Sequence, residues 1–201
     1  MDGTAIESDT LLYEIFMRLY DLYKDGQRKT KEEIYYFSGP PIRETLRKEF
    51  PNMDNDFMND EFHRIGYPLY DSCIHNFPHA PEVFKKLKDD GFKLGIVTNK
   101  QHNLTIHALE LLGIDCYFDC VVGLNDVKNG KPNREGIDKA KSILGGEKVL
   151  YVGDNLIDYK TAENAGVDCC LVNWGPRVLP LEATSKYKMN SYLELLEYVY
   201  E

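Results

Sequence analysis

The stretch that most constrains the fold is residues 149–158. Residues 149–152 are apolar and partly β-branched, the composition of a strand that is covered on both faces. Gly153 then permits a tight turn, and Asp154 and Asp158 follow it. Open α/β sheets bind their ligands at such strand ends, and two carboxylates are hard oxygen ligands suited to Mg²⁺. Helix capping is the alternative role for the two aspartates.

The same pattern repeats along the second part of the chain, where strand-like segments alternate with helical ones. Expected strands are 92–97, 117–122, 148–152 and 167–172, and expected helices are 81–90, 103–112, 133–144, 159–165 and 191–200. This alternation is typical of an α/β fold. It predicts a Rossmann-like doubly wound parallel sheet with helices on both faces.

The first 75 residues differ, because they show helical periodicity and no convincing strand. Four helices are expected, at 11–23, 30–37, 42–50 and 54–71. Thr30 and Glu33 have the spacing of a capping box that opens the second of them. A helical bundle of this size can form a separate unit.

Charge and composition exclude several classes of protein. The net charge of −9 argues against non-specific binding of nucleic acid. No apolar run approaches the roughly 18 residues that a membrane span needs, and the polar first ten residues do not resemble a signal peptide. The five cysteines form no CxxC pair, which favours reduced thiols in a cytoplasmic protein.

Three predicted strands end in polar clusters that could share one pocket. Thr98 and Asn99 follow the first strand, Lys131 lies between Gly130 and Pro132 after the second, and the two aspartates follow the third. Each cluster alone also has a purely structural explanation. Thr98 and Asn99 could form a turn or a helix cap, Lys131 could be a solvated loop lysine, and the two aspartates could cap another helix. Together they supply a hydroxyl, a cation and a carboxylate pair, the groups needed for phosphoryl transfer.

With Asp2-Gly3-Thr4, these motifs lie in the order and spacing of the haloacid dehalogenase-like superfamily. The sequence resembles the phosphoglycolate phosphatase-like hydrolases of that superfamily over nearly its whole length. The resemblance implies an α/β core domain made of residues 1–6 and 77–201. An inserted all-helical cap domain would comprise residues 7–76.

The resemblance also implies roles for individual residues. Asp2 would be the aspartate that protonates the leaving group and then activates water. Thr98, with Asn99 beside it, would hold the transferring phosphoryl group. Lys131 would balance charge between the nucleophile and the phosphoryl group.

A Mg²⁺ cofactor is implied as well. Asp154 would ligate the ion, Asp158 would support or ligate it, and Asp2 would contribute its backbone carbonyl. Residues 39–43 match a cap loop that closes over the substrate, so Arg43 is a candidate substrate contact. A surface arginine is the alternative.

The first motif departs from the family pattern, Asp-x-Asp-Gly-Thr, whose first aspartate is the nucleophile. Met1 occupies the second position, so the nucleophile would directly precede Met1, as would a strand from the middle of the sheet. We therefore expect the chain as written to be unable to form the phosphoaspartate. Three explanations compete: the start was assigned at an internal methionine codon, a segment is missing for technical reasons, or the protein is genuinely short and inactive.

The expected function is that of a Mg²⁺-dependent phosphatase acting on a small phosphorylated metabolite through a phosphoaspartate. A sugar phosphomutase is one alternative, since such enzymes of the same family share these motifs. A non-catalytic phosphate-binding protein that lost its nucleophile is another. We expect a monomer or homodimer without a nucleic-acid or membrane partner.

Overall fold

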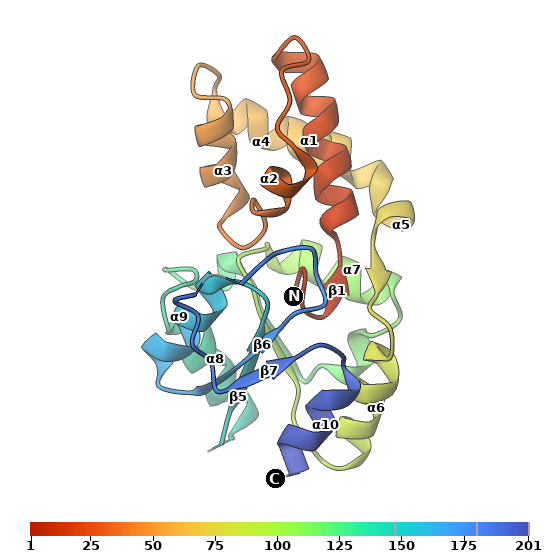
Figure 1. Ribbon diagram of the computed structural model, residues 1–201, viewed down its shortest axis with the longest axis vertical. Helices are drawn as coiled ribbons and strands as arrows, with labels where there is room; N and C mark the ends of the chain where they lie inside the picture. Colours follow the sequence, from red (N-terminus) through yellow and green to blue (C-terminus); the bar gives the residue numbers. More distant parts are fainter. Residues whose placement is uncertain (147, 180, 201) are drawn as a thin grey trace.

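The computed structural model describes residues 1–146, 148–179 and 181–200, and it has a helical part above an α/β part (Figure 1). In the α/β part, helices and parallel strands alternate as the sequence predicts. Its elements are α6 (Ala80–Asp89), β3 (Gly95–Val97), α7 (His102–Leu111), β4 (Cys120–Val122), α8 (Glu135–Leu144), β5 (Leu150–Gly153), α9 (Leu156–Ala165), β6 (Asp168–Val172), β7 (Tyr187–Met189) and α10 (Leu193–Tyr200). Short 3₁₀ helices η2 (Asp115–Tyr117) and η3 (Leu124–Asp126) flank β4.

The parallel strands form two ladders. β3 pairs with β4, while β5, β6 and β7 pair in that order, with Tyr151 opposite Cys169. Among the described residues no ladder joins β3 to β5. The family resemblance implies a further, central strand at this position in the sheet, which would end just before Met1. The first residues instead fold back on themselves, because the Met1 carbonyl accepts hydrogen bonds from the amides of Thr4, Ala5 and Ile6 at 3.2, 2.8 and 3.1 Å.

The helical part comprises α1 (Asp9–Tyr23), α2 (Lys31–Tyr35), α3 (Ile42–Glu49), α4 (Asn55–Gly66), the 3₁₀ helix η1 (Tyr67–Leu69) and α5 (Tyr70–Cys73). The capping box at α2 is confirmed, with the Glu33 amide donating to Thr30 Oγ1 at 3.2 Å and the Thr30 amide to Glu33 Oε2 at 2.8 Å. The single helix expected at 54–71 is wrong. It breaks at η1, where Pro68 lacks an amide hydrogen for the helical ladder.

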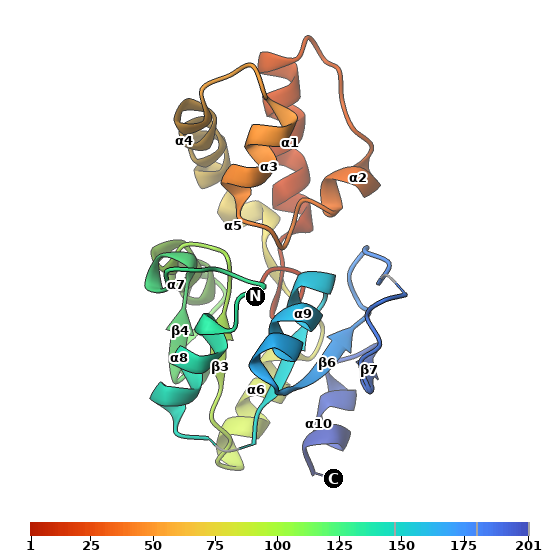
Figure 2. The same ribbon diagram turned by 90° about the vertical axis from the view of Figure 1, so that its left-hand side faces the viewer.

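Two short strands that the sequence analysis did not predict connect the two parts. β1 (Ile6–Glu7) runs antiparallel to β2 (His75–Asn76), with Ile6 opposite Asn76. β7 was also unexpected, and the strand expected at 92–97 is shorter because it begins only at Gly95. Figure 2 shows the crossing near the N-terminus, beneath α1 and α5 and above the strands. The helical part is thus tethered at one side by two adjacent segments.

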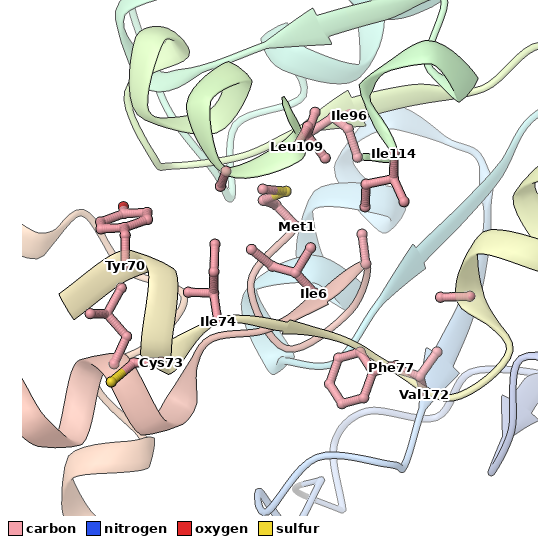
Figure 3. Close-up of a cluster of buried hydrophobic side chains, with 14 of the residues drawn as sticks. Met1, Ile6, Tyr70, Cys73, Ile74, Phe77, Ile96, Leu109, Ile114 and Val172 are labelled. Carbon is pink, nitrogen blue, oxygen red and sulfur yellow. The ribbon is translucent and has the colours of Figure 1, made fainter. Parts of the chain in front are cut away.

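One apolar cluster extends through this crossing from the helical part into the α/β part. Figure 3 shows Met1 and Ile6 beside Ile74 of the crossing and Leu109 of α7, and all four side chains are buried. The same cluster continues upward through α1, where Phe16 and Tyr20 are fully buried. Among the described residues, no helix is long and apolar enough to cross a membrane.

We expect Ile6→Ala to destabilise both parts together, because Ile6 is fully buried at the crossing. Truncating such a side chain typically lowers the free energy of unfolding by about 2–5 kcal/mol. Urea denaturation followed by circular dichroism measures the change. Leu22→Ala is the matched control, since Leu22 is 57% exposed and its loss should cost less than about 0.5 kcal/mol. Equal effects of the two substitutions would contradict this account of the core.

Candidate active site

A cavity of about 180 Å³ lies between the helical part and the carboxyl ends of β3 and β5. All candidate residues from the sequence analysis line it: Asp2, Arg43, Thr98, Asn99, Lys131, Asp154 and Asp158. Thr98 directly follows β3, and its amide donates to the Val122 carbonyl at 3.0 Å, which continues the ladder with β4. Asp154 directly follows β5. Residues from distant parts of the sequence therefore meet because parallel strands end at one edge.

The floor of the cavity is the side formed by the α/β part. Lys131 and Asp158 form a buried ion pair there. Lys131 Nζ lies 2.7 Å from Asp158 Oδ1, and the side chains are 8% and 6% exposed. The other Asp158 oxygen accepts hydrogen bonds from the amides of Asp154 and Asn155. Burial alone would raise the pKa of Asp158, but Lys131 and these donors hold it below its usual value. Both groups are therefore charged at neutral pH.

Asn99 holds the backbone of Lys131 in place. Its Oδ1 accepts from the Lys131 amide at 2.8 Å, and its Nδ2 donates to the carbonyls of Lys131 and Gly39 at 3.1 and 3.0 Å. The side chain of Asn99 thus ties the Lys131 loop to the connection between α2 and α3. A direct contact between Asn99 and a phosphoryl group stays a prediction.

Asp2 lies in the same floor and is held by two polar side chains. Its Oδ1 accepts from Ser8 Oγ at 2.7 Å and from Lys100 Nζ at 2.9 Å. Burial alone would raise the pKa of Asp2, but the Lys100 charge dominates and lowers it to about 2. Lys100 also lies over the Tyr70 ring, 5.2 Å from its centroid. The sequence analysis gave Lys100 no role, although its place after Thr98 and Asn99 was a usable signal.

Asp154 is neutralised by an arginine that the sequence analysis did not identify. Arg177 Nε donates to Asp154 Oδ2 at 2.9 Å, and Thr4 Oγ1 donates to Oδ1 at 2.6 Å. The guanidinium also bonds Asp9 at the start of α1 and the carbonyl of Tyr35, the last residue of α2. Arg177 and Asp9 are only 5% and 2% exposed. Arg177 thus bridges the α/β part and the helical part through buried charge.

Arg177 already pairs with Asp154, so a divalent cation at that carboxylate would have to share it with the guanidinium or displace it. Asp158 is committed to Lys131, and the Asp2 carboxylate to Lys100 and Ser8. Among residues 1–146, 148–179 and 181–200, no three acidic, histidine or cysteine side chains are grouped as metal ligands. The ligand set Asp2, Asp154 and Asp158 stays a prediction.

Arg43 lies in the first turn of α3, at the wall of the cavity that belongs to the helical part. It forms an ion pair with Asp56, and the two side chains are 48% and 77% exposed. Exposed pairs of this kind contribute little to stability. A contact between Arg43 and the substrate stays a prediction.

Asp9 generates a prediction about pH. Burial raises its pKa to about 6 from an ordinary value of 3.8, Arg177 offsets only part of this shift, and its Oδ2 has no hydrogen-bond partner. Folding therefore favours the protonated carboxyl, and stability is lost as the pH rises from about 4 to 6. We expect Asp9→Asn to raise the free energy of unfolding at pH 7 by roughly 1–3 kcal/mol and to leave it unchanged near pH 4.

Urea denaturation at several pH values between 4 and 7 measures this difference. The exposed Asp115 supplies the control, since Asp115→Asn should change stability little at any of these pH values. A gain for Asp9→Asn that is as large at pH 4 as at pH 7 would contradict the assignment.

Comparisons with known proteins agree with this geometry. The sequence profile of the haloacid dehalogenase-like hydrolases matches residues 1–172. Pyrophosphatase PpaX of Halalkalibacterium halodurans is 32% identical over 179 residues, covering 88% of this chain and 82% of the relative. A haloacid dehalogenase-like family hydrolase from Streptococcus pneumoniae has a TM-score of 0.81 at 20% identity, covering 99% and 95% of the two chains. A structure described as a predicted phosphoglycolate phosphatase from Haemophilus somnus gives 0.85 at 18%, covering 99% and 95%. The predicted resemblance is confirmed, and the chain belongs to the haloacid dehalogenase-like hydrolase family.

Proposed function

We propose that this protein is a Mg²⁺-dependent phosphatase of small phosphorylated metabolites that works through a phosphoaspartate. The observation that carries the proposal is the convergence of Asp2, Thr98, Lys131 and Asp154 on the floor of one cavity. These residues provide an acid–base group, a hydroxyl, a buried ammonium and a carboxylate for a metal. The relative named a pyrophosphatase supports phosphoryl transfer to water as the reaction class.

The nucleophile in this proposal is an aspartate joined to the nitrogen of Met1. That nitrogen is buried, and the charged groups that act on it are those of Lys131, Asp158, Asp2 and Asp154. A residue attached at this point would therefore enter the floor of the cavity.

The reaction would proceed in two steps. The aspartate oxygen attacks phosphorus, the bond from phosphorus to the leaving oxygen breaks, and Asp2 gives that oxygen a proton. The Asp2 carboxylate then takes a proton from water as the water oxygen attacks phosphorus, which breaks the bond to the aspartate. The depressed pKa of Asp2 suits the second step. For the first step Asp2 must bind a proton, and the negative charge of a bound phosphoryl group shifts its pKa in that direction.

The other floor residues would stabilise charge in both steps. Lys131 would compensate the negative charge shared by the nucleophile and the phosphoryl oxygens. Thr98 would donate its hydroxyl hydrogen to one of those oxygens. When bound at Asp154, Mg²⁺ would supply further charge neutralisation and orient the phosphoryl group.

The test uses three proteins that differ only before Met1. They are the 201-residue chain, a chain with an N-terminal extension ending in aspartate, and the same extension ending in asparagine. We expect Mg²⁺-dependent release of phosphate from p-nitrophenyl phosphate by the aspartate form alone. The other two should be lower by at least about 10³-fold, because covalent catalysis needs the carboxylate.

Lys131→Met in the aspartate form controls for contaminating enzyme, since it should abolish turnover without removing the nucleophile. Equal turnover by the aspartate and asparagine forms would contradict the phosphoaspartate route. Isomerisation of a sugar phosphate without release of phosphate would favour the phosphomutase alternative. Phosphate binding by all three proteins without turnover would favour the binding protein.

Lys100 generates a second prediction, because it is the largest single influence that lowers the pKa of Asp2. In the aspartate form, Lys100→Met should raise the pKa of Asp2 toward its ordinary value. Because the first step needs protonated Asp2, we expect the alkaline limb of the pH profile of kcat/KM to move to higher pH by about one unit or more. Lys93→Met provides the control, since Lys93 pairs with Asp119 far from the cavity and should leave the profile unchanged. A profile that does not move would show that Asp2 does not control this limb.

A further inference from the structure

The cavity has two chemically different walls. Its floor, on the α/β part, carries the charged and polar residues described above. Its roof, on the helical part, is mainly apolar and aromatic: Leu12, Ile15, Phe37, Ile42, Phe62 and Tyr67 all line it. A phosphoryl group on the floor would place the rest of the substrate against this roof. The side chains of the roof therefore influence which leaving groups the cavity accepts.

Two aromatic side chains of the roof, Phe37 and Phe62, pack against a buried ring behind them. The ring of the fully buried Phe16 lies 4.7 Å from the Phe37 ring and 6.0 Å from the Phe62 ring, measured between centroids. The Tyr67 ring stacks on His107 at 5.9 Å. An apolar group that enters the cavity thus meets a surface that is already organised. Such preorganisation lowers the cost of binding.

The positive charges around the cavity are already paired. Lys131 is bonded to Asp158, Lys100 to Asp2, and Arg43 to Asp56 outside the cavity. His63 also lines the wall, and burial lowers its pKa, so it is neutral at pH 7. A substrate with a second phosphate would have to draw Arg43 away from Asp56 or place its charge against the apolar roof, and the latter is costly.

The size of the cavity is consistent with one small ring beside the phosphoryl group. A cavity of about 150 Å³ lined by leucine, isoleucine and phenylalanine binds benzene. The cavity here measures about 180 Å³ and shares those residue types in its roof.

We infer that the substrate is a phosphate monoester of a small aryl alcohol, with the phosphoryl group on the floor and the ring against the roof. This inference rests on the proposed function and specifies its substrate class. It also separates the protein from the relative named a pyrophosphatase, because the cation that the roof offers to a second phosphate, Arg43, is already paired with Asp56. The apolar contacts between the ring of the substrate and the roof supply the selectivity for aryl esters.

The test measures binding, so it does not depend on turnover. Isothermal titration calorimetry of the 201-residue chain with Mg²⁺ compares three ligands that resist hydrolysis: phenylphosphonate, methylphosphonate and methylenediphosphonate. We expect phenylphosphonate to bind at least 10-fold more tightly than either of the others. Phe62→Ala and Leu12→Ala should each remove most of the phenyl advantage and leave methylphosphonate binding unchanged.

Phe57→Ala is the matched control, since Phe57 packs on Tyr23, is 45% exposed and does not line the cavity. It should retain the full phenyl advantage. Circular dichroism identifies any variant that fails to fold, and two roof variants keep the test decisive if one does.

The outcomes separate this inference from the function on which it rests. Equal affinities for the phenyl and methyl ligands, or tighter binding of methylenediphosphonate, would overturn the inference and leave phosphatase activity intact. A phenyl advantage that survives both roof substitutions would also overturn it. Failure of all three ligands to bind, with or without Mg²⁺, would overturn the proposed phosphoryl site as well.

Discussion

The arrangement of the molecule depends on the pairing of buried carboxylates with cations. Three aspartates of the floor are removed from water, and each has its own partner: Asp2 has Lys100, Asp158 has Lys131 and Asp154 has Arg177. Burying an unpaired charge costs several kcal/mol, so each partner offsets much of the cost of burying its carboxylate. The partners come from distant segments, and the native fold is required to bring them together.

Arg177 also links the paired charges of the floor to the helical part. It joins Asp154 at the end of β5 to Asp9 at the start of α1 and to the Tyr35 carbonyl at the end of α2. The same charge that stabilises the floor therefore contributes to the position of the helical part. Any change that withdraws Asp154 from Arg177 leaves a buried guanidinium with fewer partners. The chemistry of the floor and the placement of the roof are physically coupled.

The sequence predicted the floor better than it predicted the links between the two parts. Thr98 and Asp154 were identifiable because an apolar run, a turn and a polar residue occur together within a few positions. Arg177 carries no such local signal, since it lies in an irregular segment between β6 and β7 and its partners are 168 and 23 residues away. Its role arises only from tertiary structure. The helix expected at 54–71 was wrong because apolar periodicity outweighed the visible signal of Pro68.

The short strands β1, β2 and β7 were also not predictable from the sequence. β1 and β2 have only two residues each, too few for an alternating pattern to be recognised, and they are held by pairing with one another. β7 pairs with β6 in a segment whose sequence alternates weakly. The alternation of long apolar runs with helices was sufficient for the fold class. The short connecting strands depend on contacts between residues far apart in the sequence.

The connection between α2 and α3 reaches down to the floor, where two asparagine amides hold it (Figure 1). Asn155 Nδ2 donates to the Ser38 carbonyl at 3.0 Å, and Asn99 Nδ2 donates to the neighbouring Gly39 carbonyl. A β-carbon at Gly39 would lie only 2.9 Å from the Asn155 amide nitrogen, so glycine permits this close approach. Two hydrogen bonds of this kind contribute about 1–3 kcal/mol together. That is small beside the stability of a folded protein, so this end of the helical part can separate from the floor without unfolding either part.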